Sequence, residues 1–108
     1  MTTPAIINGI NHLEKTFNKK IKFIDYSTYI NIYTDIHTIS DLELFIAELK
    51  KTHVYTNPKF DYVSIQVNIL HTHSGNGYHI MLVGSETLNS DNSITRKENF
   101  FAVVHKSI

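Results

Sequence analysis

Three histidines stand close together around a glycine-rich turn, in the stretch ILHTHSGNGYH at residues 69–79. His71 and His73 are two residues apart on an expected strand, so both imidazoles project from one face and could bind the same metal ion. A catalytic zinc site needs at least three protein ligands. The third would be His105 from the last expected strand, His79 in a less favoured hairpin register, or a carboxylate. The metal hypothesis therefore names His71, His73 and His105, with an incomplete ligand set.

The same histidines also suit a structural role without a metal ion. The turn SGNG joins two expected strands, and an Asn-Gly pair at its centre favours a type I′ hairpin. That register places His73 opposite Ile80 and His71 opposite Leu82, on the core face, while His79 points to the other face. Where the hydrophobic core ends near the edge of the sheet, histidine can pack the apolar part of its ring inward and keep its polar edge in water. We expect this role for His71 and His73.

The composition is that of an ordinary globular protein, and the length of 108 residues predicts a single domain over residues 1–108. Ten basic residues balance ten acidic residues, whereas a dedicated nucleic-acid binder carries a basic surplus, so nucleic acid is an unlikely partner. The chain has no cysteine, which excludes disulfides and thiolate zinc sites and is compatible with a reducing compartment. Neither a signal peptide nor an apolar membrane span is visible in the sequence, so we expect a cytoplasmic protein without membrane association.

The common catalytic motifs are missing from the sequence. It contains no nucleophile elbow, no phosphate-binding loop, no dinucleotide fingerprint and no zinc-protease pair of histidines. Ser74 follows His73 directly, but adjacent residues of a strand point to opposite faces and cannot act together. We therefore expect no catalytic residues and no cofactor, and the protein is more easily explained as a binding protein than as an enzyme.

Two helices are expected from apolar residues spaced three or four apart. The first covers residues 3–18, with Thr3 as its N-cap and Pro4 at the first helical position, where proline is favoured. The second covers residues 40–52, where Ser40 and Glu43 have the spacing of a capping box. Its apolar stripe consists of Leu42, Phe45, Ile46 and Leu49.

The remaining segments are expected to be strands. Residues 21–36 predict two strands, or one long strand broken near Ser27, although a helix over residues 27–36 also fits the spacing. A long alternating strand over residues 60–73 turns Val63, Ile65, Val67 and Ile69 to the core. The segments YHIMLVG and NFFAVVH follow as strands, joined by a polar and flexible connection over residues 85–98.

These elements predict an α+β fold, in which an antiparallel sheet of four to five strands carries two helices on one face and ends in a three-stranded meander. Two helices can cover only one face of such a sheet. The other face would expose an apolar patch, which soluble monomers seldom leave bare. Its expected partner-binding residues are Leu70, His79, Met81 and Val83, joined by either Phe101 and Val103 or by Phe100, Ala102 and Val104.

The predicted function is therefore protein binding through this patch. The sequence suggests an inhibitor or an immunity-type accessory protein of phage or mobile-element origin, with an unidentified protein partner. A two-fold homodimer that buries the patch against itself is also expected. The alternative function is a small histidine-dependent enzyme or metal-binding protein centred on His71 and His73.

Overall fold

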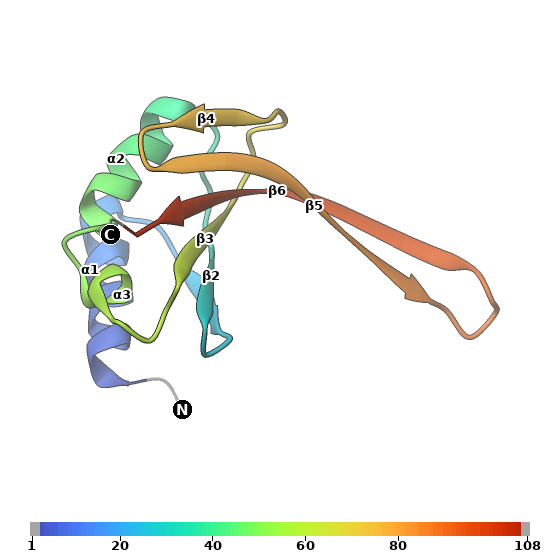
Figure 1. The fold of residues 1–108 in the computed structure, drawn as a ribbon, viewed down its shortest axis with the longest axis horizontal. Coiled ribbons are helices and arrows are strands. Elements are labelled where there is room, and N and C mark those ends of the chain that lie inside the picture. Colours follow the sequence, from blue (N-terminus) through green and yellow to red (C-terminus); the bar gives the residue numbers. More distant parts are fainter. Residues whose placement is uncertain (1–2, 107–108) are drawn as a thin grey trace.

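A computed structural model describes residues 3–106 of the chain as an α+β fold in which a single sheet carries the helices on one face (Figure 1). The order of elements is α1 (Pro4–Phe17), β1 (Lys22–Asp25), β2 (Tyr29–Tyr33), α2 (Ile39–Leu49), α3 (His53–Thr56), β3 (Tyr62–Val67), β4 (His73–Gly75), β5 (Tyr78–Leu88) and β6 (Ile94–His105). The six strands lie side by side in the order β1-β2-β3-β6-β5-β4. The α+β class predicted from the sequence is thus confirmed.

The sheet differs in detail from the prediction of four to five antiparallel strands and two helices. It has six strands and is mixed, because β2 and β3 run parallel while all other neighbours are antiparallel. Parallel neighbours require a long crossover connection. Residues 34–61 supply it, and they contain both α2 and the short helix α3 that the sequence pattern did not reveal.

The long strand expected over residues 60–73 is divided into two strands at different places in the sheet. β3 ends at Val67, where the backbone N–H of Asn68 donates to the Ile36 carbonyl over 2.8 Å and its side-chain amide donates to Asp35 over 2.8 Å. The chain then crosses to the far edge and forms β4. The C-terminal meander therefore consists of β4, β5 and β6, and β6 separates β3 from β5.

The two long helices lie close to where the sequence places them. α1 begins after Thr3 with Pro4 in its first turn, as expected. For α2 the expected capping box of Ser40 and Glu43 is wrong, because Thr38 is the N-cap and its hydroxyl oxygen accepts from the Asp41 N–H over 3.1 Å. Thr38 and Asp41 have the same spacing as Ser40 and Glu43, two residues earlier in the chain.

Residues 22–33 form an antiparallel hairpin, so the prediction of two strands is confirmed. The single long strand and the helix over residues 27–36 are wrong. Ser27 occupies the left-handed region at φ 76°, and its backbone N–H donates to the Asp25 carboxylate over 2.8 Å. Asp25 also accepts a bond of 2.7 Å from Lys59, which ties the turn to the loop before β3. The β-branched and aromatic residues of this segment favour the extended backbone.

A single hydrophobic core fills the space between the helices and the sheet. It includes the predicted helix stripe of Leu42, Phe45, Ile46 and Leu49, and the predicted strand stripe of Val63, Ile65, Val67 and Ile69. α1 adds Ile6, Ile10 and Leu13, and all of these side chains are buried. The two apolar stripes thus lie in one core, as expected.

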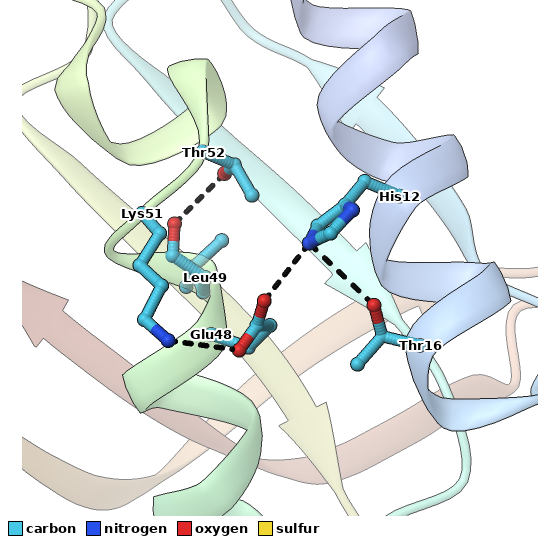
Figure 2. A network of polar contacts seen from close by, with 6 residues as sticks. All are labelled: His12, Thr16, Glu48, Leu49, Lys51 and Thr52. Carbon is cyan, nitrogen blue, oxygen red and sulfur yellow. Dashed lines mark hydrogen bonds and ion pairs between the residues drawn. The ribbon is translucent and has the colours of Figure 1, made fainter.

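A polar network joins the solvent side of α1 to α2 (Figure 2). His12 lies 2.9 Å from a carboxylate oxygen of Glu48, and Lys51 lies 3.4 Å from the other oxygen. The hydrogen bond from His12, followed by that from Lys51, lowers the pKa of Glu48 below its usual value. Both contacts lie at the surface, where such pairs add little to stability.

The polar connection expected to be flexible over residues 85–98 is instead a two-stranded arm that projects beyond the rest of the sheet (Figure 1). We call residues 83–99 the arm. Its ladder runs from Val83 opposite Asn99 to Leu88 opposite Ile94. Cross-strand pairs stabilise it, including a 2.6 Å ion pair between Arg96 and Glu86. The radius of gyration of 14.7 Å exceeds the roughly 13 Å of a compact chain of this length because of this projection.

Candidate functional site

The face of the sheet opposite the helices carries a hollow between its central strands. Strand alternation assigns the residues: Val63 and Ile65 of β3 point into the core, so Tyr62, Ser64 and Gln66 point outward. This agrees with the alternation expected from the sequence, in which Val63, Ile65 and Val67 face the core. We call the hollowed part of this open face the outer groove.

The first hollow of the outer groove has a volume of about 440 Å³. Four strands contribute to its lining: Tyr29, Asn31, Tyr62, Ser64, His79, Met81, Val83, Phe101, Val103 and His105. Met81 and Val83 remain 40% and 43% exposed, although they are apolar. Of the two apolar sets considered for the last strand, Phe101 and Val103 are thus the ones that join the groove. Its volume lies within the range of ligand-binding pockets.

A row of stacked tyrosines forms one side of the groove. The ring centroids of Tyr26 and Tyr29 lie 4.9 Å apart, and those of Tyr29 and Tyr62 also lie 4.9 Å apart with an interplanar angle of 9°. Tyr29 and Tyr62 are directly opposite each other on the parallel strands β2 and β3. The ring of Tyr29 is stacked between those of Tyr26 and Tyr62, so it offers its edge and its hydroxyl group to a ligand.

The hydroxyl group of Tyr62 remains a hydrogen-bond donor at neutral pH. Partial burial raises the pKa of Tyr62, and the neighbouring Tyr29 and Asp61 raise it further. A raised pKa keeps the phenol uncharged. Tyrosine at such a position combines a large apolar surface with a polar edge, which is why it is common in binding interfaces.

Two histidines close the end of the groove near the C-terminus. The rings of His79 and His105 stack with centroids 4.7 Å apart, and His105 Nε2 lies 2.8 Å from His79 Nδ1. One of these nitrogens must carry the proton that the other accepts. These two ring nitrogens are therefore hydrogen-bond partners of each other.

A second hollow of about 510 Å³ continues the groove toward the base of the arm. The two hollows share Tyr29, Asn31, Val83 and Phe101. The second one is more polar and includes the amide side chains of Asn31, Gln66 and Asn99. The side-chain amide of Gln66 donates to Oδ1 of Asn99 over 3.0 Å. An amide group offers up to four hydrogen-bonding positions, so these three side chains retain capacity for a ligand.

The outer groove carries almost no formal charge. Within the described chain, no aspartate, glutamate, lysine or arginine lines the first hollow, and Lys97 is the charged side chain that lines the second. A lack of charged residues at the centre of a surface is typical of binding interfaces.

The structure brings three of the four expected partner-binding residues together. His79, Met81 and Val83 lie on successive outward positions of β5 and line the groove. Leu70 does not join them, since it lies in the crossing segment between β3 and β4 with 80% of its surface exposed. The expectation for Leu70 depended on one continuous strand, and the crossing removes it from the groove.

The three histidines of the metal hypothesis are separated by the sheet. His73 lies opposite Ile80, as expected, and therefore on the core side, with its ring 6.4 Å from that of His71. His105 lies in the outer groove on the opposite face. Residues 71–72 form no ladder with Leu82, so His71 is exposed. Within residues 3–106, no group of three or more potential ligand side chains is arranged to hold a metal ion.

The sequence reasoning missed the tyrosine row and the contribution of β2. A usable signal was present: Tyr29, Asn31 and Tyr33 alternate with the buried Ile30 and Ile32. That alternation predicts one outward face but not the strand beside it. The parallel pairing of β2 with β3, which sets Tyr29 beside Tyr62, depends on contacts distant in sequence.

Comparison of the chain with protein-family models, with curated proteins and with solved structures gave no match. Within the described residues, the longest helices fall short of the length and apolar character needed to cross a membrane.

Proposed function

We propose that this protein is a protein-binding module whose outer groove receives an extended segment of a partner protein. The observation that carries the proposal is the uncharged apolar hollow on the open face of the sheet, with Met81 and Val83 exposed in it. Soluble monomers rarely expose contiguous apolar patches, and the patches that they do expose often mark interaction sites.

An extended chain fits the groove better than a compact small molecule. The first hollow is open and continues into the second, so the two form a trough instead of an enclosed pocket. A small-molecule site buries most of its ligand's surface. In the trough, an apolar side chain would occupy the first hollow while the amides of Asn31, Gln66 and Asn99 bond the main chain that follows.

The lining also indicates which partner segment would bind. The apolar floor of Met81, Val83 and Val103 favours an anchor such as leucine, isoleucine, methionine or phenylalanine. Lys97 in the second hollow favours an acidic residue next to the anchor. The preferred segment therefore combines one large apolar residue with a small acidic bias.

The arrangement of the tyrosine row favours protein over single-stranded nucleic acid. Nucleic-acid platforms offer free aromatic faces on which bases stack. Here the faces of Tyr26, Tyr29 and Tyr62 are stacked on one another. A base could not stack on Tyr29 without separating it from one of its two neighbours.

Within this proposal we retain the role of an inhibitor or immunity-type accessory protein of a phage or mobile element, acting in the cytoplasm. Such proteins act by occupying a partner's surface, and the outer groove would be the surface used. The histidine-dependent alternative receives less support, because His105 pairs with His79 and not with His71 or His73.

A displayed library of random peptides tests the proposal without knowledge of the natural partner. Peptides are selected on the wild-type protein and then measured by titration against Val103→Glu, which introduces a charge into the floor of the groove. We expect the selected peptides to share one large apolar residue and to lose at least tenfold in affinity for the variant, because a buried charge needs a partner.

The matched control is Ile7→Glu, which introduces the same charge at an exposed apolar position of α1. Peptides should bind this control as tightly as the wild type. If no selected peptide distinguishes Val103→Glu from Ile7→Glu, the groove is not the binding surface and the proposal fails.

A further inference from the structure

β5 presents a long backbone edge that no other strand covers. On the side away from β6 it pairs with β4, but only from Tyr78 to Ile80. β5 continues to Leu88, and within the described chain no strand lies against its residues 81–88 on that side. Every second residue there directs its N–H and C=O outward, which makes the edge a template for another strand.

The other free edges of this sheet are protected in ways that this one is not. β1 and β4 are short, and β1 carries Lys22 and Asp25. The part of β6 within the arm carries Arg96, Lys97 and Glu98. Short length and charged side chains are the usual means of preventing edge pairing.

The segment MLVGSETL of β5 has only one charge, Glu86, and Arg96 of the same arm neutralises it over 2.6 Å. The segment contains neither proline nor lysine, the residues that most often block an edge. Met81, Leu82, Val83 and Leu88 are all at least 40% exposed along it. This edge is therefore suited to pairing.

We propose that residues 82–88 of β5 pair antiparallel with the same residues of a second copy of the chain, about a two-fold axis at Ser85. The sheet would then continue from one copy into the other. The inference does not rest on the proposed function, since it uses the backbone edge of β5, whereas the proposed function uses side chains on the open face.

The register follows from the residues themselves. A two-fold axis perpendicular to the sheet keeps outward residues beside outward residues, so the axis must pass beside one residue and not between two. An axis at Glu86 would set two like charges opposite each other, which is unfavourable. An axis at Gly84 would set Leu82 against Glu86 and would place Leu88 at Ile80, where β4 already occupies the edge.

The axis at Ser85 avoids both difficulties. It sets Leu82 of each copy opposite Leu88 of the other, and Val83 opposite Thr87. Leu82 and Leu88 lie on the same face and are 46% and 70% exposed in the single chain. Directly opposed side chains lie within contact distance. The pairing would cover four leucines in all, two from each copy.

The sequence-based expectation of a dimer through the open face is replaced by this one. A dimer through the open face would need the two hollowed surfaces to complement each other in shape. Pairing along the edge needs no such fit, because backbone hydrogen bonds supply the complementarity.

Engineered cysteines test this register directly, since the natural chain contains none. Ser85→Cys would place two thiols opposite each other across the axis, with Cα atoms at a distance that a disulfide can span. Thr87→Cys is the control, because its thiol would lie opposite Val83 of the other copy and far from its own equivalent. Under mild oxidation at micromolar concentration, we expect covalent dimers of the first variant to form at least tenfold faster.

A mixture of two different cysteine variants tests the register at a second pair of positions. Val83→Cys and Thr87→Cys should each fail to form dimers alone but should form a mixed disulfide together. Equal cross-linking rates for Ser85→Cys and Thr87→Cys, or the absence of dimers in both, would overturn the proposal while leaving the peptide-binding result at the groove unaffected.

Sedimentation of two further variants gives a measurement without oxidation. Leu88→Lys adds a charge on the pairing edge, whereas Ile94→Lys adds the same charge to the residue directly across the arm, one strand away from that edge. We expect Leu88→Lys to be monomeric and Ile94→Lys to remain dimeric. A monomeric wild-type protein, or dimers in both variants, would contradict the inference.

Discussion

The hydroxyl of Tyr78 donates to the Glu43 carboxylate over 2.7 Å in a nearly buried position, so its proton is held tightly. Burial, followed by the hydrogen bond and the charge of Glu43, raises the pKa of Tyr78 to about 12 from its usual value of 10.0. The bond also joins the start of β5 to α2.

This raised pKa makes stability depend on pH in the alkaline range. Below pH 10 the unfolded and folded states both keep the proton, and the contribution of the bond is complete. As pH rises from 10 to about 12, Tyr78 ionises in the unfolded state first, and the free energy of unfolding should decrease. We expect Tyr78→Phe to reduce this decrease in urea unfolding measured at stepped pH. An identical slope in wild type and variant would exclude Tyr78 as its source.

Gly9 allows α1 to approach α3 closely. A Cβ atom at this position would lie 2.8 Å from Val54 Cγ2, and Val54 is completely buried. Alanine would favour the helix by about 1 kcal/mol. We nevertheless expect Gly9→Ala to destabilise the protein by about 1–3 kcal/mol, the usual cost of overpacking, measured by urea unfolding.

The double variant Gly9→Ala/Val54→Ala provides the control for this contact. If the clash with Val54 causes the loss, adding Gly9→Ala to the Val54→Ala background should cost much less than adding it to the wild type. Equal costs in both backgrounds would place the cause elsewhere.

At the scale of elements, α2 is the helix whose burial the sequence predicts most directly. Phe45 lies in the core and packs against Phe17 of α1, with ring centroids 5.3 Å apart. We expect Phe45→Ala to lower the free energy of unfolding by about 3–5 kcal/mol. Leu44→Ala, at the neighbouring exposed position, should change it by no more than about 0.5 kcal/mol. Similar losses in the two variants in urea melts would contradict the packing described here.

Local patterns identified most of the elements but not their neighbours. The helical spacing of Leu42, Phe45 and Leu49 and the alternation of Val63, Ile65 and Val67 depend on residues close in sequence, and both faces are confirmed as buried. The break after Val67 could not be predicted in this way, because the alternation continues through Ile69 while the chain leaves the strand. The contacts of Asn68 with residues 35 and 36 cause this break.

The arm shows a similar difference between composition and structure. Residues 85–98 are polar, and polar segments usually form loops, which explains the expectation of a flexible connection. Here Glu86 and Arg96 are directly opposite each other, as are Thr87 and Thr95. Such pairs become visible only when the register of β5 and β6 is known.

At the scale of the whole molecule, the helices cover one face of the sheet and leave the other open. The sequence predicts this, because two helices can cover only one face. The outer groove could be predicted in part, since β5 contributes His79, Met81 and Val83 through simple alternation. Its other side could not, because the tyrosine row depends on the parallel pairing of β2 and β3. The presence of Lys97 and Tyr33 in the same hollow likewise depends on how β6 pairs within the sheet.

The charge of Lys97 provides a test of partner chemistry at this scale. Lys97→Glu would reverse the formal charge in the lining of the second hollow without altering the apolar floor. We expect it to weaken the binding of peptides that have an acidic residue beside their apolar anchor, and to leave peptides without the acidic residue unchanged. Titration of both peptide classes at two salt concentrations measures this, since the difference should shrink as salt rises. Equal effects on both classes would show that Lys97 does not contact the bound segment.

The most direct test of the central claim is a map of backbone amide chemical shifts in the isotope-labelled protein, recorded as a groove-selected peptide is added. We expect the perturbed amides to lie on the four strands of the outer groove, in residues 29–33, 62–66, 79–83 and 99–105. The helices α1 and α2, on the other face of the sheet, should remain almost unchanged. Perturbations concentrated on α1 and α2, with the four strands unaffected, would contradict the account.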